Sequence, residues 1–471
     1  MRGMLLSAAL FSATLQAAVP AQEAERLRGE LTPLGAIRAA SADGAIPAWR
    51  DALEHARTVP DKGWWEQAQD RWRQWRGETL PAQRYTDPFV EDQPLFTITA
   101  ANRQEYGQWL SAGQQALFDA YPDSYRLPVY PSRRPVGAPD WVYAAVHRNA
   151  LNAELDGSDD RLRGAMHGIP FPIPGQGAEV IWNHKLRYRG QAGRRWNVQS
   201  LVNPDGAIQI MKVAEDLKFR YYMPEQSFAD LDNVYYYVLQ MIHTPERMAG
   251  AVVLVHETMD QVSEPRKAWV TKPGSRRLRA APTVGYDNPG TASDGQRTND
   301  QADVFNGAMD RYDWRLVERR DMIVPYNSYR IHAAEHGYAD ILTPRHINQD
   351  LTRYERHRVW VVEATVKPRQ SHLYKRRTFY VDEDSWTILG VDVYDQKDEL
   401  WRVQEAHTFY AYDQRSTLSA IETVYDIKNQ RYLTQAMNNE DAEWTEREIP
   451  DSYYAPPAVQ QLGRSLQAAL R

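Results

Sequence analysis

The chain has 471 residues, no cysteine and a formal net charge of −6 at neutral pH. Without a basic excess, nucleic acid is a poor candidate for a partner. The lack of cysteine excludes disulfides, cysteine nucleophiles and the lipidated cysteine of a bacterial lipoprotein, so the core alone must stabilise the fold.

The first residues are typical of a secretory signal. Arg2 precedes an apolar run at residues 4–15, and the small residues Ala17 and Ala18 follow. Charge, short apolar run and small residues in this order predict a cleavable signal peptide over residues 1–17. The run is shorter than the roughly 20 residues that cross a bilayer. We therefore expect a periplasmic protein that is not a lipoprotein, although an N-terminal helix of the mature fold is the alternative.

Residues 18–160 show few regular patterns and are rich in proline and tryptophan. We expect an irregular N-terminal arm that wraps the core. Two helices are predicted inside it. The first covers residues 66–76, and the second covers residues 99–121 with Thr99 as its cap.

From residue 179 the pattern becomes that of strands, so residues 161–430 are predicted to form the main domain, an antiparallel β domain. The first predicted strand alternates apolar and polar residues between residues 179 and 189. Further strands are predicted at residues 233–242, 251–255, 358–366, 377–381, 386–394, 399–412 and 419–428. Short turns at 382–385 and 396–398 predict an antiparallel meander that places Trp386 and Trp401 on adjacent strands.

Two further segments complete the predicted architecture. Glycine and short polar residues dominate residues 283–309, which predicts a long loop within the main domain. Residues 431–471 are expected to be an extension with a closing amphipathic helix at residues 458–470.

One face of the predicted strands is apolar, and such a face must either pack against other parts of the protein or bind a ligand. We expect this face to bind an apolar ligand, and the alternative is that it forms a filled core. The residues that we expect to contact a ligand are Trp182, Leu186, Tyr188, Trp360, Val362, Trp401, Val403 and Phe409.

One catalytic motif was weighed. His332, Glu335 and His336 form an H-x-x-E-H pattern, which binds zinc when one helix presents both imidazoles. Gly337 follows at once, so a short helix or exposed loop competes with this interpretation. The acidic turn at residues 382–384 lacks the glycine and distal glutamate of a calcium loop, so its charges are expected to face solvent. We expect no catalytic residues, no metal and no cofactor.

Several ordered segments resemble a family of Gram-negative exported proteins, the domain of unknown function thirteen-twenty-nine. The matching segments include ADGAIPAW at residues 42–49, GIPFPIP at 168–174, VPYN at 324–327, HRVWVVEA at 357–364 and YVDEDSW at 380–386.

That family is similar to the LolA/LolB group of lipoprotein carriers. The resemblance implies an open, strongly curved antiparallel half-barrel with helices across its concave face, hence an α+β, mostly β fold. It also implies that members hold acyl chains and work beside outer-membrane barrels and inner-membrane exporters. We therefore hypothesise a non-enzymatic carrier of a hydrophobic molecule or acyl chain. The alternatives are a zinc hydrolase or a structural partner of an envelope transport complex.

Overall fold

The computed structural model describes residues 19–51, 85–156, 159–271, 277–281, 287–442 and 444–469. The predicted signal peptide and the predicted helix at residues 66–76 lie outside these ranges. Within the described residues, no helix combines the length and the apolar character that crossing a membrane requires.

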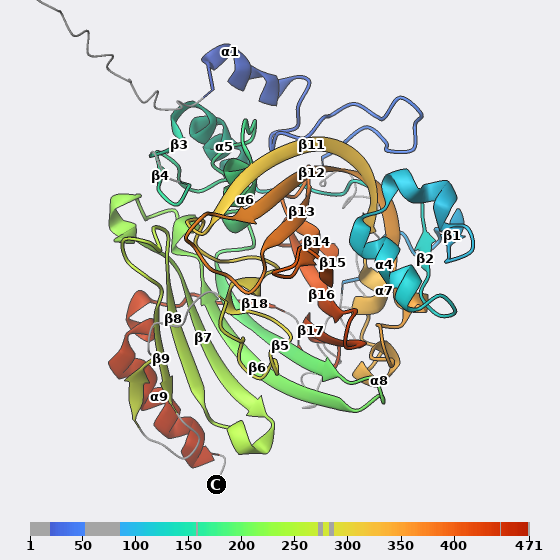
Figure 1. Cartoon of the computed structure of the whole chain (residues 1–471). Helices are drawn as coiled ribbons and strands as arrows, with labels where there is room; N and C mark the ends of the chain where they lie inside the picture. Colours follow the sequence, from blue (N-terminus) through green and yellow to red (C-terminus); the bar gives the residue numbers. More distant parts are fainter. Residues whose placement is uncertain are drawn as a thin grey trace, which may run out of the picture.

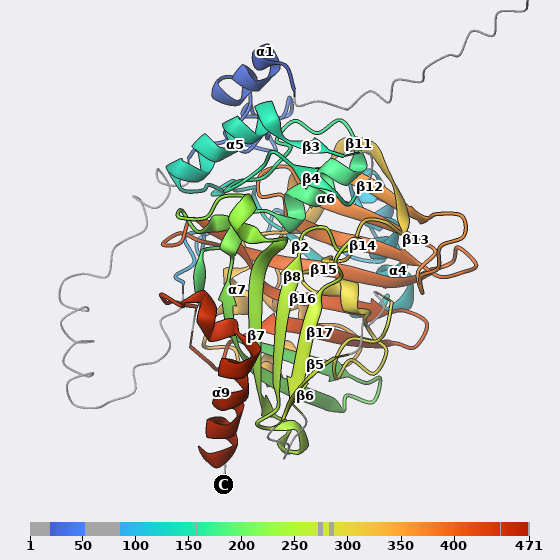
Figure 2. The ribbon, with the colours of Figure 1, turned by 90° about the vertical axis from the view of Figure 1, so that its left-hand side faces the viewer.

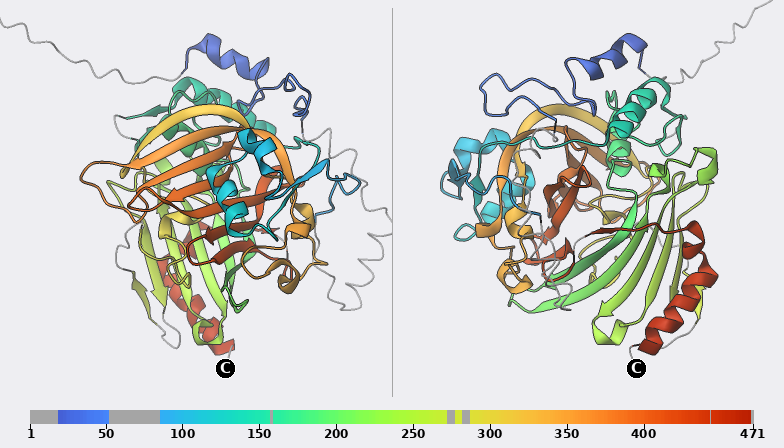
Figure 3. Two further views of the ribbon diagram at one scale, coloured as in Figure 1. Left: turned by 45° about the vertical axis from the view of Figure 1, so that its right-hand side comes forward. Right: turned by 180° about the vertical axis from the view of Figure 1, so that it is seen from behind.

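One large sheet dominates the fold, and it is mixed, open and strongly curved (Figures 1 and 3). Sixteen strands of the described chain belong to it, in the order β1-β2-β12-β13-β14-β15-β16-β17-β5-β6-β7-β8-β9-β10, with β11 also paired to β12 and β18 to β5. The pairings are antiparallel except for one parallel bridge between β2 and β12. The predicted class, mostly β with covering helices and an open curved sheet, is therefore confirmed in outline.

The strands have the following bounds: β1 (Phe96–Ile98), β2 (Leu127–Val129), β5 (Ala192–Val202), β6 (Ile208–Lys218), β7 (Val234–Thr244), β8 (Val252–Thr258), β9 (Lys267–Thr271), β10 (Leu278–Ala280), β11 (Tyr312–Pro325), β12 (Tyr354–Val366), β13 (Arg376–Asp382), β14 (Ile388–Tyr394), β15 (Leu400–Ala411), β16 (Ser416–Asp426), β17 (Arg431–Met437) and β18 (Thr445–Glu446). A separate hairpin joins β3 (Glu154–Leu155) and β4 (Leu162–Arg163).

The α-helices are α1 (Ala21–Ala24), α4 (Ala112–Ala120), α5 (Asp140–Asn152), α6 (Gly177–Lys185), α7 (Tyr329–His332), α8 (Tyr338–Ile341) and α9 (Pro456–Ala469). The 3-10 helices are η1 (Glu25–Arg28), η2 (Arg103–Trp109), η3 (Arg220–Tyr222), η4 (Ala229–Leu231), η5 (Glu246–Met248), η6 (Asn299–Gln301), η7 (Gln349–Leu351) and η8 (Asp451–Tyr454).

The predicted meander is confirmed. Strands β13, β14, β15 and β16 follow one another in sequence and pair antiparallel. Tyr394 lies opposite Leu400, so the turn between β14 and β15 is short, as expected. Trp401 lies on β15 as predicted, but the prediction that Trp386 lies on the adjacent strand is wrong, because Trp386 lies in the turn just before β14. The sheet also extends beyond residue 430, because β17 pairs with β16 and β5.

The predicted strand at residues 179–189 is wrong, because this segment forms helix α6. All nine residues of α6 are buried, and Figure 1 shows the helix beneath the arch of β11 and β12. The polar side chains that suggested a solvent face are hydrogen-bonded inside the protein. Asn183 bonds both backbone groups of Phe171, and Lys185 Nζ donates to the carbonyl of Gly307 at 3.0 Å.

Close contact with the sheet explains why α6 begins at a glycine. A Cβ atom added to Gly177 would lie 2.9 Å from Val362 and 3.0 Å from the backbone of Arg315. The helix therefore packs directly on β11 and β12 and fills part of the concave side of the sheet.

The predicted helix at residues 99–121 is broken into η2 and α4. Ser111 starts a new helix between them, since its side chain accepts a hydrogen bond from Gln114 N and Gln114 reciprocates in a capping box. The same Ser111 hydroxyl donates to buried Asp392 at 3.0 Å, which ties the new helix start to β14.

The predicted closing helix is present as α9, and it covers the outer face of β8, β9 and β10 (Figures 1 and 2). Leu239, Val252 and Leu254 point outward from the strands and cluster with Val459 of α9 and Tyr454 of η8. This wing of the sheet therefore has a covered outer face, which leaves the opposite face for other contacts.

Replacing Trp182 by alanine should lower the free energy of unfolding by about 3–5 kcal/mol, the usual cost of a cavity left by a buried tryptophan. The side chain is fully buried, and its indole donates to the carbonyl of Asp159 at 2.6 Å. Urea unfolding measures the change. Trp141→Ala is the matched control, because Trp141 is 38% exposed and should lose clearly less. Equal losses would show that α6 is not part of the core.

Candidate functional site

The concave side of β5–β9 borders a cavity of about 610 Å³. Its walls come from the inward residues of these strands, from the segment 291–311 and from residues that follow α6. A volume of this size lies within the roughly 300–1,000 Å³ that small-molecule sites occupy. The cavity is therefore the candidate ligand site.

The register of β6–β9 builds an apolar wall. Leu217 on β6 lies opposite Val238 on β7, which lies opposite Val255 on β8, and Val255 lies opposite Ala268 on β9. All four residues line the cavity. Since side chains alternate across a strand, the residues between them, such as Leu254, point to the other face and contact the C-terminal segment instead.

The neighbouring row of residues changes from charged to apolar across the same strands. Pairing places Arg195, Glu215, Gln240, Val253 and Val270 side by side in that order. Arg195 Nε donates to Glu215 at 2.7 Å, and Gln240 donates to the same carboxylate at 2.8 Å. The cavity thus has a polar side near β5 and an apolar side near β9.

Arg297 adds a cation to the polar side. Its Nε donates to Gln199 Oε1 at 3.1 Å, and among the described residues it forms no ion pair with a carboxylate. Burial raises the pKa of the nearby Glu422 carboxyl, which accepts a hydrogen bond from Gln435 at 2.5 Å. Arg195 and Glu215 form an ion pair on this side of the cavity, and Arg297 adds a further guanidinium to its lining.

The predicted loop near residues 283–309 closes one side of the cavity. In its described part, from residue 287, it contains only the short helix η6 and one isolated bridge, and many of its polar residues are buried. Asp303 accepts hydrogen bonds from Arg187 and Arg189 at 2.5 Å each. Asp300 accepts from Arg377 on β13 at 2.7 Å. Two ion-paired aspartates therefore hold the loop inside the sheet.

The ion pairs also set the charge of Asp303. Burial alone would raise the pKa of its carboxyl, but the guanidinium groups of Arg187 and Arg189 hold that pKa well below its ordinary value. Asp303 therefore stays ionised at neutral pH and binds the loop to the residues that follow α6.

Of the eight residues predicted to contact a ligand, the structure places only Phe409 in the cavity lining. Trp182, Leu186 and Val362 are buried in the core around α6, and Tyr188 packs against that core. Trp360 stacks on Trp386, with 6.2 Å between ring centroids.

The last three of the eight residues, Trp401, Val403 and Phe409, are divided between two faces of β15. Trp401 packs with the core around α6, whereas Val403 and Phe409 belong to a second core cluster. A β-bulge between β14 and β15 near Trp401 shifts the alternation, so a period of two fails across it.

The H-x-x-E-H segment does not form a zinc-binding helix. Helix α7 ends at His332, whose ring is buried and stacks on Phe409 with centroids 4.1 Å apart. Glu335 and His336 follow outside the helix, and the Glu335 side chain is 78% exposed. The three residues therefore do not share one helix face.

The expectation that residues 382–384 face solvent is wrong. Asp382, Glu383 and Asp384 are all buried. Arg134 binds Asp384 through two nitrogens at 2.8 Å each, and Arg358 binds Glu383 at 2.5 Å. These arginines are remote in sequence or on another strand, so a local pattern could not reveal them.

The two arginines also hold the N-terminal arm. Arg134 donates to the carbonyls of Ile37 and Pro47, and Arg358 donates to the carbonyls of Ile37 and Ala39. The buried acidic turn is thus the attachment point of the arm.

Comparison with known proteins identifies the family. The model of the family described as protein of unknown function, DUF1329, matches residues 97–460. The chain belongs to the DUF1329 family. It is 42% identical to "Uncharacterized protein PA3922" of Pseudomonas aeruginosa over 462 residues, which cover 98% of this chain and 97% of that protein.

Solved structures with a similar fold include three of 11–15% identity. A DUF1329 family protein from Desulfovibrio piger has a TM-score of 0.39 and covers 57% of this chain and 92% of its own. A putative outer membrane lipoprotein-sorting protein domain from Vibrio parahaemolyticus has a TM-score of 0.41, with 60% and 98% covered. LolA superfamily protein NE2245 from Nitrosomonas europaea has a TM-score of 0.36, also with 60% and 98% covered.

Replacing Asp303 by asparagine should reduce stability at pH 7 by about 1.5–3 kcal/mol, the range for hydrogen bonds to charged groups. A carboxyl whose pKa is lowered in the folded state adds stability above its unfolded pKa of about 3.9 and loses it as the pH falls below that value. The difference between wild type and variant should therefore be largest at neutral pH and shrink below about pH 4.

Urea unfolding at several pH values measures this difference. Asp294→Asn is the control on the same loop, because the Asp294 side chain is 69% exposed, and it should change little at any pH. A loss for Asp303→Asn that does not depend on pH would argue against the ionised contact.

Proposed function

We propose that this DUF1329 protein is a periplasmic, non-enzymatic binding or carrier protein whose ligand is an amphipathic, lipid-like molecule held in the cavity. The observation that carries the proposal is the 610 Å³ cavity with an apolar wall at one side and hydrogen-bonding groups at the other. The resemblance of the family to LolA/LolB-type carriers agrees with it. An outer-membrane barrel and an inner-membrane exporter are the partners that this resemblance suggests.

The two rows of inward residues suit a ligand that has one apolar end and one polar end. An alkyl or ring system removes apolar surface from water when it contacts Val238, Val255 and Ala268, and this burial favours binding by about 25 cal/mol for each Å². A purely apolar molecule would leave Arg195 and Arg297 buried against it without new partners, which costs free energy. A polar head group on the same molecule removes that cost.

The hydrogen bonds of Arg297 suggest the sign of the head group. Within the described part of the chain Arg297 forms no ion pair with a carboxylate, so a carboxylate or phosphate can accept from it without breaking an ion pair. We therefore propose an anionic amphiphile, such as a fatty acid, as the ligand class.

Filling the apolar wall should abolish binding. Val255→Trp places a large ring in the cavity and should weaken binding of a fluorescent fatty-acid analogue by at least about tenfold, or 1.4 kcal/mol. Fluorescence titration measures the dissociation constant. Val317→Trp is the matched control, because Val317 lies on β11 with 40% exposure and outside the cavity lining, and its affinity should match wild type. Wild-type protein that binds no such probe would contradict the proposal.

Arg297→Gln tests the head group separately. The variant should bind palmitate about tenfold more weakly than wild type, because a charge-assisted hydrogen bond is lost. It should bind hexadecanol, which has the same chain and no charge, almost as wild type does. Competition with the fluorescent analogue measures both affinities. Equal weakening for the acid and the alcohol would place the head group elsewhere.

A further inference from the structure

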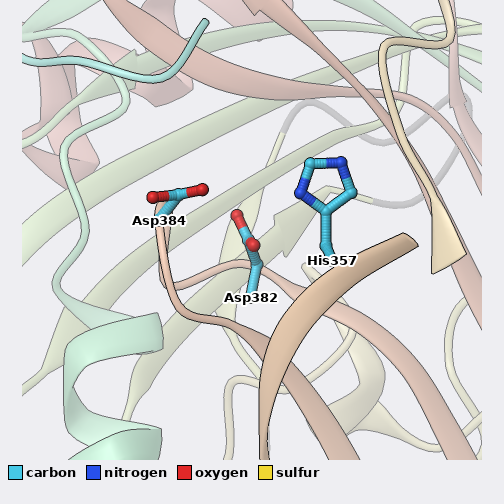
Figure 4. A group of neighbouring side chains, drawn as sticks. All are labelled: His357, Asp382 and Asp384. Atoms are coloured by element: carbon cyan, nitrogen blue, oxygen red, sulfur yellow. The ribbon is translucent and has the colours of Figure 1, made fainter. Parts of the chain in front are cut away.

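A second group of side chains, outside the cavity lining, has the composition of a metal site. His357 on β12, Asp382 at the end of β13 and Asp384 in the following turn are all buried. Each offers one ligand atom, and these atoms lie within 4.8 Å of one another. Figure 4 shows the two carboxylates and the imidazole ring turned toward a common point.

The hydrogen bonds of His357 leave one ring nitrogen for this point. Its Nε2 lies 2.9 Å from Glu355 Oε2, and since an ionised carboxylate only accepts, Nε2 carries the proton. In a neutral imidazole the other nitrogen, Nδ1, then holds a lone pair, and it is the nitrogen that faces the aspartates in Figure 4. A histidine that binds metal commonly has this second-shell carboxylate on its far nitrogen.

Asp382 supplies a second atom that lacks a partner. Its Oδ2 accepts from the Tyr326 hydroxyl at 2.9 Å and from both the backbone and the hydroxyl of Ser385. Its Oδ1 is buried and, among the described residues, accepts no hydrogen bond. A buried polar atom without a partner is costly, so it calls for a cation, a proton or a water.

The closeness of His357, Asp382 and Asp384 is not explained by contacts among these three side chains. No hydrogen bond or ion pair in the described structure joins the His357 ring to Asp382 or Asp384. Two zinc ligands, each about 2.0–2.2 Å from the ion, lie at most about 4.4 Å apart, so small side-chain shifts would complete a site from this spacing.

We propose that His357 Nδ1, Asp382 and Asp384 bind one divalent transition-metal ion of the Zn²⁺ or Mn²⁺ type. One imidazole nitrogen with two carboxylate oxygens suits these ions, whereas Ca²⁺ and Mg²⁺ prefer oxygen ligands alone. Asp382 and Asp384 bring two negative charges to the ion, and the Asp384 carboxylate also pairs with Arg134.

The position of the site gives it a structural role. The ion links β12 to the turn after β13, beside the Asp384 carboxylate that Arg134 binds. Arg134 in turn holds the carbonyls of Ile37 and Pro47, so the ion stabilises the attachment of the N-terminal arm. This inference does not depend on the ligand proposed for the cavity.

The experiment uses the full mature chain, unfolded in urea with a chelator and refolded with ZnCl2, MnCl2, CaCl2 or no metal. After desalting, metal content is measured by mass spectrometry and thermal unfolding by calorimetry. We expect about one zinc or manganese ion per chain with a higher Tm, and no retained calcium. Wild-type protein that retains no metal in any arm, with an unchanged Tm, would overturn the proposal.

Two variants make the assignment specific. Asp382→Asn keeps the shape of the side chain and should retain no metal, with a Tm that does not respond to zinc. His336→Gln removes an accessible histidine of the H-x-x-E-H segment and should bind metal as wild type does. If Asp382→Asn does not refold, His357→Gln replaces it. Full retention of metal by a refolded variant of Asp382 or His357 would also overturn the proposal.

Discussion

The curvature of the sheet is the constraint on which the rest of the structure depends. A sheet that bends this strongly encloses more space than its own side chains fill, so other segments must enter its concave side. Helix α6 fills one part and the segment 287–309 fills another, and each carries polar groups inside with it. Those groups are satisfied by specific partners, such as Asp303 with Arg187. The space that neither segment occupies is the cavity along β5–β9.

Buried ion pairs link segments that are distant in this sequence, as disulfides do in other proteins. The chain has no cysteine, and its long connections are fastened by arginine and carboxylate pairs at a few interior points. Asp300 fastens the long loop through Arg377, and Asp384 fastens the arm through Arg134. Breaking one partner of such a pair leaves an uncompensated buried charge, which costs more than the pair contributes when intact.

Sequence reasoning found the parts of the fold that rest on local patterns. The meander was predictable because its turns are short and its strands alternate, and α9 was predictable from its amphipathic spacing. Strands β5 and β6 were missed because their inward residues, such as Arg195 and Glu215, are charged, which hides an apolar face. Helix α6 was misread as a strand because a helix buried on all sides has no polar face to show its period.

The candidate site was harder to predict than the fold for the same reason. The apolar wall lies on β6–β9, and of those strands only parts of β7 and β8 were recognised from the sequence. The buried state of Asp382–Asp384 depends on Arg134, which is about 250 residues away in the chain. No pattern of neighbouring residues reveals a partner at that distance, so the sequence predicted a turn exposed to solvent, which was incorrect.

The side chains of β7–β9 alternate between two faces, and this alternation limits which sequence changes the protein can tolerate. Val255 faces the cavity and its neighbour Leu254 faces the C-terminal segment, so each strand serves two different surfaces with alternate residues. A substitution on one surface can change the shape of the cavity without altering the other surface. Insertion or deletion of one residue within a strand would exchange the two surfaces at once. Point substitutions can thus change the cavity lining alone, whereas changes of length are tolerated in the turns between the strands.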